Sequence, residues 1–185
     1  VDTAAGNTLN ISGVIYDLSG FAGTPFIKTD SGTLILSGAN TYSGPTTVNG
    51  GTLEVDGTTA GGAVAVNSGA TLLGTGTIGG ATTINAGGIL AVKAGGVGVL
   101  AFNNKAVTLN GGSTNVMQIS KTGGVLTNDV IRGFATLTFG GTLVVTNITS
   151  DSTALAVGDK FYLFPKGAGN YAAGYANFSL PALPG

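Results

Sequence analysis

Residues 47–55 read Thr-Val-Asn-Gly-Gly-Thr-Leu-Glu-Val, and closely similar stretches follow along the chain. Residues 65–72 read Ala-Val-Asn-Ser-Gly-Ala-Thr-Leu, and residues 83–92 read Thr-Ile-Asn-Ala-Gly-Gly-Ile-Leu-Ala-Val. The asparagines of the three copies stand at positions 49, 67 and 85, so the interval between copies is the same both times. Looser copies begin at positions 108 and 138, after longer intervals. A repeat of this kind predicts an architecture built from stacked, equivalent units.

Each unit reads as two short strands joined by a tight turn of glycine and asparagine. Leu53 and Val55 alternate with Glu54 and Asp56, so the apolar pair lies on one strand face and the carboxylates on the other. No stretch of eleven or more residues shows a helical period. A propeller blade needs about 40–45 residues, and the leucine frame of a leucine-rich repeat is missing. We therefore predict an all-β fold, a right-handed parallel β-helix (β-solenoid) with rungs of about 18–25 residues.

Stacked rungs bring equivalent residues of successive repeats into columns about 4.8 Å apart. The residue before each asparagine is apolar and is expected to point inward. The predicted interior column consists of Val48, Val66, Ile84, Leu109 and, before Gly140 in the last copy, Phe139. The asparagines share one register at a turn, so they are expected to bond to one another between rungs as a structural ladder rather than to bind a ligand. The predicted ladder consists of Asn49, Asn67, Asn85 and Asn110.

The composition indicates a packed core under a weakly charged surface. Hydrophobic residues make up 43% of the chain, which is too many for a disordered segment. Charged residues make up only 8%, and the net charge is −1. Seven Lys and Arg spread along the chain do not form a phosphate-binding patch, so no nucleic-acid partner is expected. No apolar run approaches the roughly 20 residues of a membrane-spanning helix, so no transmembrane segment is expected.

Two residue types that are common in catalytic sites are missing. Histidine and cysteine are absent, which excludes Ser-His-Asp and Cys-His sites. Glu54 and Asp56 would lie about 7 Å apart and would suit an acid–base pair only in a cleft, so we interpret them as a solvated outer face. Residues 74–79 match G-x-G-x-x-G, but no helix is predicted after them. Asp151 and Asp159 lack any known calcium-binding frame. We predict no enzyme activity and no catalytic, cofactor-binding or metal-binding residue.

Aromatic residues gather near the end of the chain. They either close the core with a terminal layer or form a platform that binds a cell-surface glycan or a partner, and the core layer is the favoured interpretation. These residues are Phe161, Tyr162, Phe164, Tyr171, Tyr175 and Phe178. The sequence thus divides a single domain into N-terminal first rungs at 1–30, repeat rungs at 31–146 and an aromatic closing segment at 147–185.

The segment Thr8-Leu9-Asn10-Ile11-Ser12-Gly13-Val14-Ile15 reads as a strand ahead of the repeat. Such a strand completes its own first rung or adds to the open edge of another copy. Its apolar residues, the candidate assembly strand, are Leu9, Ile11, Val14 and Ile15. No capping helix is predicted at either end, and head-to-tail contacts that do not close generate filaments. Other copies of the chain are therefore expected partners.

Residues 31–57 resemble the autotransporter-associated β-strand repeat, also called the passenger-associated transport repeat. Its frame is G-T-L-x-L-x-G-x-N-T-Y-x-G-x-T-x-V-x-x-G-T-L-x-V, and the chain follows it from Gly32-Thr33-Leu34 to Gly51-Thr52-Leu53. The resemblance implies a parallel β-helix passenger that is secreted by a bacterium or displayed on its outer surface. The expected function is an extracellular structural rod that assembles end to end. The alternatives are an adhesin that binds glycan or host surface and, less favoured, a polysaccharide-active β-helix enzyme.

Overall fold

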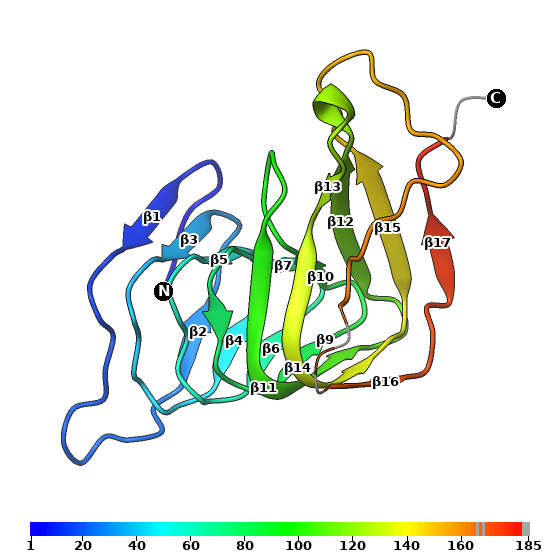
Figure 1. The fold of residues 1–185 in the computed structure, drawn as a ribbon. Helices are drawn as coiled ribbons and strands as arrows, with labels where there is room; N and C mark the ends of the chain where they lie inside the picture. The colour runs from blue at the N-terminus through cyan, green and yellow to red at the C-terminus, as the bar shows by residue number, and fades with distance from the viewer. Residues whose placement is uncertain (166, 168, 183–185) are drawn as a thin grey trace.

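The computed structural model describes residues 1–165, 167 and 169–182 as a parallel β-helix, in which strands stack along the molecule from the N-terminal to the C-terminal side (Figure 1). Residues 166, 168 and 183–185 of the predicted closing segment lie outside the described residues. The described part holds one short 3₁₀ turn, η1 (Thr122–Gly124), and no α-helix. None of its helical segments is long and apolar enough to cross a membrane. The predicted all-β parallel β-helix is confirmed.

Two long sheets carry the strands, and spatial order follows chain order in both. The first sheet contains β1 (Thr8–Ile11), β3 (Thr33–Leu36), β5 (Gly51–Val55), β7 (Ala70–Leu73), β10 (Ile89–Ala91), β12 (Thr114–Ser120), β15 (Thr142–Asn147) and β17 (Asn177–Ser179), with β13 (Thr127–Asn128) antiparallel to β12. The second contains β2 (Phe26–Lys28), β4 (Thr46–Val48), β6 (Val64–Val66), β9 (Thr82–Ile84), β11 (Val99–Leu109), β14 (Val130–Thr138) and β16 (Asn170–Ala172), with β8 (Thr77–Ile78) beside β11.

A third ribbon of backbone hydrogen bonds runs beside the two sheets. The N–H of Asn40 donates to the carbonyl of Thr58 (3.1 Å), and the N–H of Thr59 donates to that of Thr77 (3.0 Å). β8 and the first part of β11 continue the ribbon. Each turn of the chain thus visits the second sheet, the first sheet and this ribbon before it starts the next rung.

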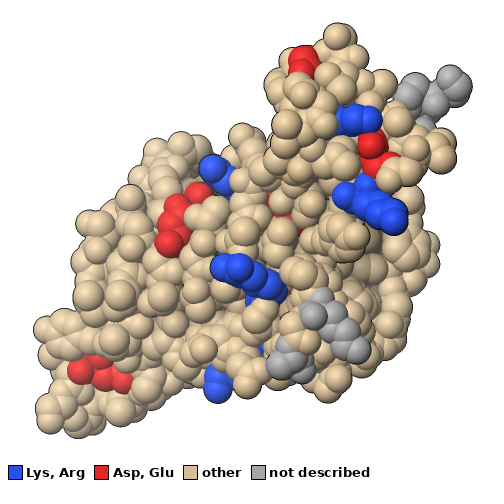
Figure 2. Space-filling view, viewed as in Figure 1, with Lys and Arg blue, Asp and Glu red and all other residues tan. Residues whose placement is uncertain are grey.

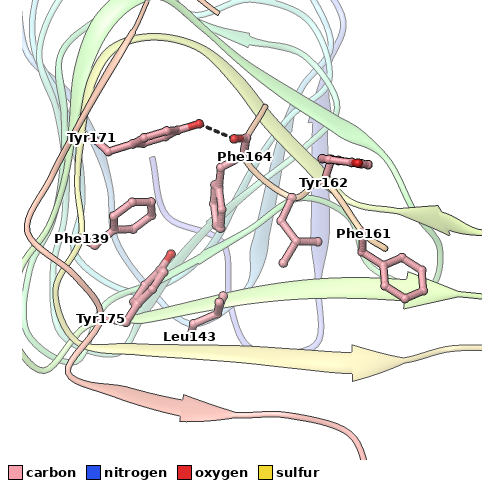
Figure 3. Close-up of a pocket in the computed structure, with 8 residues that line it drawn as sticks. Phe139, Leu143, Phe161, Tyr162, Phe164, Tyr171 and Tyr175 are labelled. Carbon is pink, nitrogen blue, oxygen red and sulfur yellow. Dashed lines mark hydrogen bonds between the residues drawn. The ribbon is translucent and has the colours of Figure 1, made fainter. Parts of the chain in front are cut away.

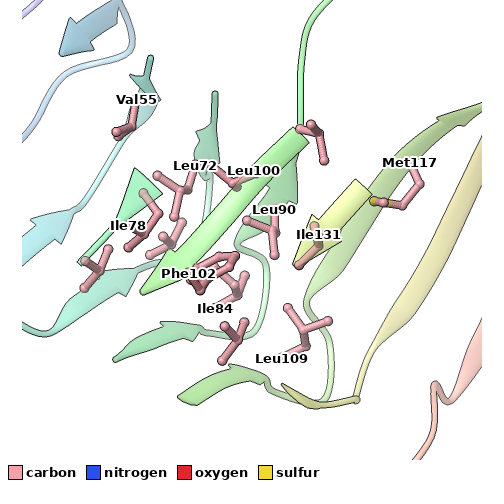
Figure 4. Close-up of a cluster of buried hydrophobic side chains, with 14 of the residues drawn as sticks. Val55, Leu72, Ile78, Ile84, Leu90, Leu100, Phe102, Leu109, Met117 and Ile131 are labelled. Atoms are coloured by element: carbon pink, nitrogen blue, oxygen red, sulfur yellow. The ribbon is translucent and has the colours of Figure 1, made fainter. Parts of the chain in front are cut away.

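The core is a continuous stack of apolar side chains inside the rungs (Figure 4). Leu34, Leu53 and Leu72 pair in register on β3, β5 and β7, and each is 0% exposed. Burying one such side chain contributes roughly 1.5–3 kcal/mol relative to leaving it in water. Because the strands alternate inward and outward residues, every rung adds such side chains to the same stack.

Glycines stack where successive rungs meet at a corner. A Cβ on Gly62 would lie 2.0 Å from the carbonyl oxygen of Gly44, and a Cβ on Gly80 would lie 1.7 Å from that of Gly62. The backbones therefore touch at this corner, and only a residue without a side chain fits there. A second corner has the same arrangement at Gly57 and Gly76. These corners account for part of the glycine content of the chain.

The rungs lengthen toward the C-terminal side. Leu72 pairs with Leu90, Asn115 with Leu143, and Leu143 with Phe178, so the stretch of chain between paired residues grows from rung to rung. The rungs beyond Asn115 are longer than the range predicted from the repeat. The extra residues are inserted at one corner, between the first sheet and the third ribbon, where residues 92–98, 120–129 and 148–160 leave the rungs.

Candidate functional site

The four asparagines of the predicted ladder lie on top of one another at the turn that follows the strands of the second sheet. The Nδ2 of Asn67 donates to the Oδ1 of Asn49 (2.7 Å), and that of Asn85 to the Oδ1 of Asn67 (2.8 Å). The Nδ2 of Asn110 donates to the Oδ1 of Asn85 (3.0 Å). These side chains use one another as partners, so the column fastens four successive rungs.

The structure places the predicted interior column next to this ladder. Val48, Val66 and Ile84 pair in register at 0% exposure, and Leu109 follows Ile84 in the same column. Phe139 lies one position beyond β14 and is half-buried, and its ring packs in an aromatic cluster described below. The column therefore leads from the repeat rungs into the aromatic closing segment.

A lysine occupies the inward position of the second sheet before Val48. Lys28 pairs with Val48 and is 0% exposed. Its ammonium donates to the carbonyls of Thr29, Asp30 (2.8 Å) and Gly50 (3.3 Å). Burial lowers the pKa of the Lys28 ammonium, against the nearby charges of Asp30 and Asp2. Three carbonyls thus compensate the buried charge at the N-terminal end of the column.

The strand predicted ahead of the repeat is β1, and it pairs with β3 of its own chain. Leu9 is 42% exposed and Val14 is 51% exposed, whereas Ile11 and Ile15 are half-buried and pack against the core. Leu9 pairs with the buried Leu34, so its side chain belongs to the interior column of the first sheet. It is exposed because no rung covers it on the other side of β1 in this structure.

The two neighbouring carboxylates lie on the outside of β5 and just after it. Glu54 is half-buried, and burial followed by the charge of Asp56 raises its pKa. The Oδ1 of Asp56 accepts hydrogen bonds from the N–H (3.1 Å) and the hydroxyl (3.0 Å) of Thr75 in the next rung. Neither carboxylate lines a described cavity. The geometry is that of a strand surface.

The G-x-G-x-x-G match at residues 74–79 lies at the second glycine corner. A Cβ on Gly76 would lie 2.0 Å from the carbonyl oxygen of Gly57. Thr77 and Ile78 within the match form the strand β8, and the strand β9 follows at Thr82–Ile84, where a dinucleotide site requires a helix. These glycines allow the rungs to approach each other.

The residues inserted at one corner form a lateral ridge, defined as residues 92–98, 120–129 and 148–160. The ammonium of Lys121 forms an ion pair with Asp159 at 2.9 Å, and Asp151 accepts a hydrogen bond from the N–H of Gly123 (2.6 Å). The N–H of Ala156 and then Lys121 hold the pKa of Asp159 below its usual value. Both aspartates are therefore engaged with the ridge itself.

A buried carboxylate anchors the base of the ridge. Asp129 is 1% exposed and accepts hydrogen bonds from the N–H of Gly98 (2.8 Å) and the N–H of Gln118 (2.7 Å). Burial raises its pKa, partly offset by these two hydrogen bonds and by the charge of Lys93. One side chain thus joins the insertions of two successive rungs.

Three aromatic residues of the closing segment, Phe164, Tyr171 and Tyr175, form a cluster around Phe139 (Figure 3). The ring of Phe139 lies 4.7 Å from that of Tyr175 and 5.3 Å from that of Phe164, centroid to centroid. The hydroxyl of Tyr175 donates to the Oδ1 of Asn115 (2.7 Å), and the hydroxyl of Tyr171 donates to the carbonyl of Phe164. Burial raises the pKa of the Tyr175 hydroxyl. Ring contacts and satisfied hydroxyls are features of a packed core layer.

Two apolar cavities open beside this cluster. The first has a volume of about 450 Å³, and its lining residues are Phe139, Leu143, Phe161, Tyr162, Leu163, Phe164, Tyr171 and Tyr175. The second, of about 460 Å³, lies between the ridge and β15 and shares Phe161 and Leu163 with the first. Tyr162 and Phe178 are 69% and 62% exposed at this side of the molecule. The cluster thus combines a packed layer with an open apolar surface.

Sequence reasoning missed two residues of this inventory, Lys28 and Asp129. A signal existed for Lys28, since it precedes Gly32-Thr33-Leu34 by nearly the same interval as Val48 precedes Gly51-Thr52-Leu53, which predicts an inward position. No such signal existed for Asp129, because it lies in an insertion that has no counterpart in the earlier repeats.

Residues 26–55 match the family model of the passenger-associated-transport-repeat. The match spans β2, β3, β4 and β5, which together form more than one full rung. It overlaps residues 31–57, so the resemblance found in the sequence is confirmed. A comparison with curated protein sequences gives no match.

Proposed function

We propose that this chain is a non-enzymatic structural part of a bacterial passenger protein, a β-helical rod that lies on or outside the cell. The passenger-associated-transport-repeat at residues 26–55 supports this proposal, because that family of autotransporter repeats implies a surface or secreted location. A solenoid suits such a role, since each rung contacts only its neighbours and the rod extends by adding rungs.

The observation that carries the proposal is the unbroken asparagine ladder beside the interior column. Three side-chain hydrogen bonds of 2.7–3.0 Å tie four rungs together outside a core of fully buried side chains. The side-chain groups of this ladder are used to hold rung on rung. A molecule built in this way presents a stiff, weakly charged surface, which is what an extracellular spacer needs.

The location is tested by antibody labelling of intact and permeabilised cells that express the natural protein. Labelling of intact cells, or recovery of the protein from the medium, is the expected result. Labelling that requires permeabilisation would contradict a surface or secreted location. Negative-stain electron microscopy of the protein purified from these cells or their medium should show narrow rods. Globular particles alone would contradict the structural role.

The absence of catalysis is tested with a variant that removes both neighbouring carboxylates. Glu54→Gln combined with Asp56→Asn should fold, because both side chains lie on the outer face of the rungs and the amide oxygen introduced at position 56 can still accept the hydrogen bonds of Thr75. Parent and variant should both leave pectin and alginate undegraded in a reducing-sugar assay. Degradation by the parent that disappears in the variant would establish the enzyme alternative.

Assembly end to end is part of the proposal. β1 and β17 are the two outermost strands of the first sheet, and each has a strand partner on one side only among the described residues. Exposed strand edges are templates for pairing with another chain. Light scattering across a concentration series should show particles that grow with concentration, and a monodisperse monomer at high concentration would remove this part of the proposal.

An adhesin is the second candidate, and the exposed rings beside the aromatic cluster favour it. Tyr162 and Phe178 present large apolar faces to solvent, as sugar-binding surfaces do. Binding of the parent chain to an array of bacterial and host glycans, lost in Tyr162→Ala and Phe178→Ala variants, would support this candidate. Equal signals from parent and variants would count against it.

A further inference from the structure

We propose that copies of this chain stack with a single polarity, the C-terminal face of one copy against the N-terminal face of the next. The N-terminal face is defined by residues 1–3, β1 and residues 14–21, and the C-terminal face by β16, β17 and the first cavity. This inference rests on the proposed function of a rod that assembles end to end, and it specifies which faces meet and in what register.

The direction of the strands favours this polarity. β1 and β17 lie at opposite edges of a sheet whose strands, β13 excepted, are all parallel. A head-to-tail contact brings β1 beside β17 as one more parallel pair, so every later copy repeats the same contact and the stack grows. A two-fold contact between two β1 edges would be antiparallel and would stop at a dimer.

The contact between β1 of one copy and β17 of the next is called the seam, and the columns of side chains fix its register. Leu9 pairs with Leu34 at one edge, and Phe178 pairs with Leu143 at the other, so all four belong to one inward column. An outward row runs parallel to it and consists of Thr8, Thr33, Thr52, Thr71, Ile89, Thr114, Thr142 and Asn177. Continuing both series across the seam places Leu9 beside Phe178 and Thr8 beside Asn177.

Both faces have apolar surface to bury. Leu9, Tyr16 and Phe21 are 42%, 63% and 67% exposed on the N-terminal face. Phe178 is 62% exposed on the C-terminal face, beside the open cavity of about 450 Å³. Burying these side chains in a contact removes apolar surface from water, which favours association. The seam would thus extend the core of one copy into that of the next.

The charges of the chain are segregated along the stack. Five of the eight acidic residues lie within residues 1–56, and six of the seven basic residues lie after position 92. Lys28, the basic residue in the acidic part, is buried. In Figure 2 acidic side chains lie over the N-terminal rungs, one group of them close to a basic side chain, and most basic side chains lie from the middle of the stack to its C-terminal side, where the acidic side chains of the ridge accompany them. Opposite charge at the two ends attracts head to tail and repels head to head.

Disulfide trapping tests the polarity and the register together, because the chain contains no cysteine of its own. Parallel neighbours about 4.8 Å apart are within the Cα separation that a disulfide bridges. The variant Thr8→Cys, Asn177→Cys should give a ladder of covalent multimers under mild oxidation. The control is the variant Thr8→Cys, Ser179→Cys, whose cysteines are out of register because Ser179 pairs with Val144 rather than Thr142. This control should give no series of covalent multimers.

Each single-cysteine variant should stay almost entirely monomeric after oxidation, because a head-to-tail stack keeps like positions of neighbouring copies apart. Efficient dimers of Thr8→Cys alone, or equal ladders from the matched and mismatched pairs, would overturn the proposed polarity or register. Raising the salt from about 0.1 M to about 1 M shortens the screening length from about 10 Å to about 3 Å and should slow early growth about tenfold. An unchanged rate would overturn the role assigned to charge.

These outcomes separate this inference from the proposed function. Growth of the parent in light scattering without specific trapping would overturn the polarity and leave assembly in place. No growth and no trapping would overturn both, while antibody labelling of intact cells would still decide the surface location by itself.

Discussion

Asn67 occupies the middle of the asparagine ladder, where its amide donates to Asn49 and accepts from Asn85. Asn67→Ala removes two hydrogen bonds, whereas Asn49→Ala removes one at the end of the ladder. A hydrogen bond of this kind contributes about 1 kcal/mol net, so we expect losses of about 2 and about 1 kcal/mol in the free energy of unfolding. Chemical denaturation followed by circular dichroism measures both. Equal losses would show that the ladder does not act as a chain of bonds.

Val66 lies at the centre of the interior column with no exposed surface. Val66→Asp would place an unpaired charge among buried methyl groups, and we expect a loss of about 3 kcal/mol or more in unfolding free energy. Ala65→Asp is the matched control, because Ala65 is half-buried on the outward face of the same strand. A melting temperature of Val66→Asp close to that of Ala65→Asp would mean that the inward register is wrong.

The burial of Asp129 predicts that the free energy of unfolding depends on pH, and it predicts the sign of that dependence. Its folded-state pKa is raised above 3.8 by burial, so the native chain takes up this proton at a higher pH than the unfolded chain does. This residue therefore favours the folded state more as the pH falls through its raised pKa toward 3.8. Unfolding free energies of parent and Asp129→Asn should be measured between pH 7 and pH 4. The unfolding free energy of the variant should fall further below that of the parent as the pH falls. A difference that shrinks as the pH falls would contradict the raised pKa of Asp129.

The turns between strands offer a pair of neighbouring glycines with opposite environments. A Cβ on Gly62 would meet the backbone of the preceding rung, whereas a Cβ on Gly61 would meet nothing within 4 Å. Gly62→Ala should therefore force the rungs apart and cost about 2 kcal/mol or more, while Gly61→Ala should be close to neutral. Thermal melts of the two single variants measure the difference. Similar melts would show that the corner can relax without cost.

The regular elements follow from the sequence where the repeat is regular. The equal spacing of Asn49, Asn67 and Asn85 is enough to place their strands in register, because one rung must return each residue to the same side. The ridge could not be predicted, since the insertions at residues 120–129 and 148–160 break that spacing. The earlier repeats contain no equivalent segments with which these insertions could be aligned. The partner of Lys121 lies in a different rung, and only the folded chain brings the two together.

The aromatic cluster, too, could be predicted from the sequence only in part. Its composition is evident in the sequence, and its packing around Phe139 agrees with a terminal core layer. Which rings remain exposed depends on how β16 and β17 continue the stack, and that is a property of the last rungs as a whole. Tyr175 turns inward to Asn115, while Phe178 stays largely exposed.

The whole molecule is a one-dimensional stack, so its local stability should vary along its length. Residues of β6 and β9 have a rung on both sides, and the N–H groups of Asn67 and Asn85 donate to the rung before them at 2.9 Å. The residues of β16 and β17 are all exposed, and each strand has one neighbour. Local opening therefore costs less at the outermost strands than in the middle of the stack.

Native-state hydrogen exchange tests this gradient and its dependence on assembly. In dilute solution the amides of Asn67 and Asn85 should exchange at least about 100-fold more slowly than those of β1 and β17, which corresponds to about 2.7 kcal/mol in opening free energy. At concentrations where the chain assembles, β1 and β17 should gain protection because they pair at the seam, while the middle rungs should change little. Uniform exchange along the dilute chain would contradict the stack of nearest-neighbour rungs. Protection gained in the middle instead of at the edges would contradict assembly through the end faces.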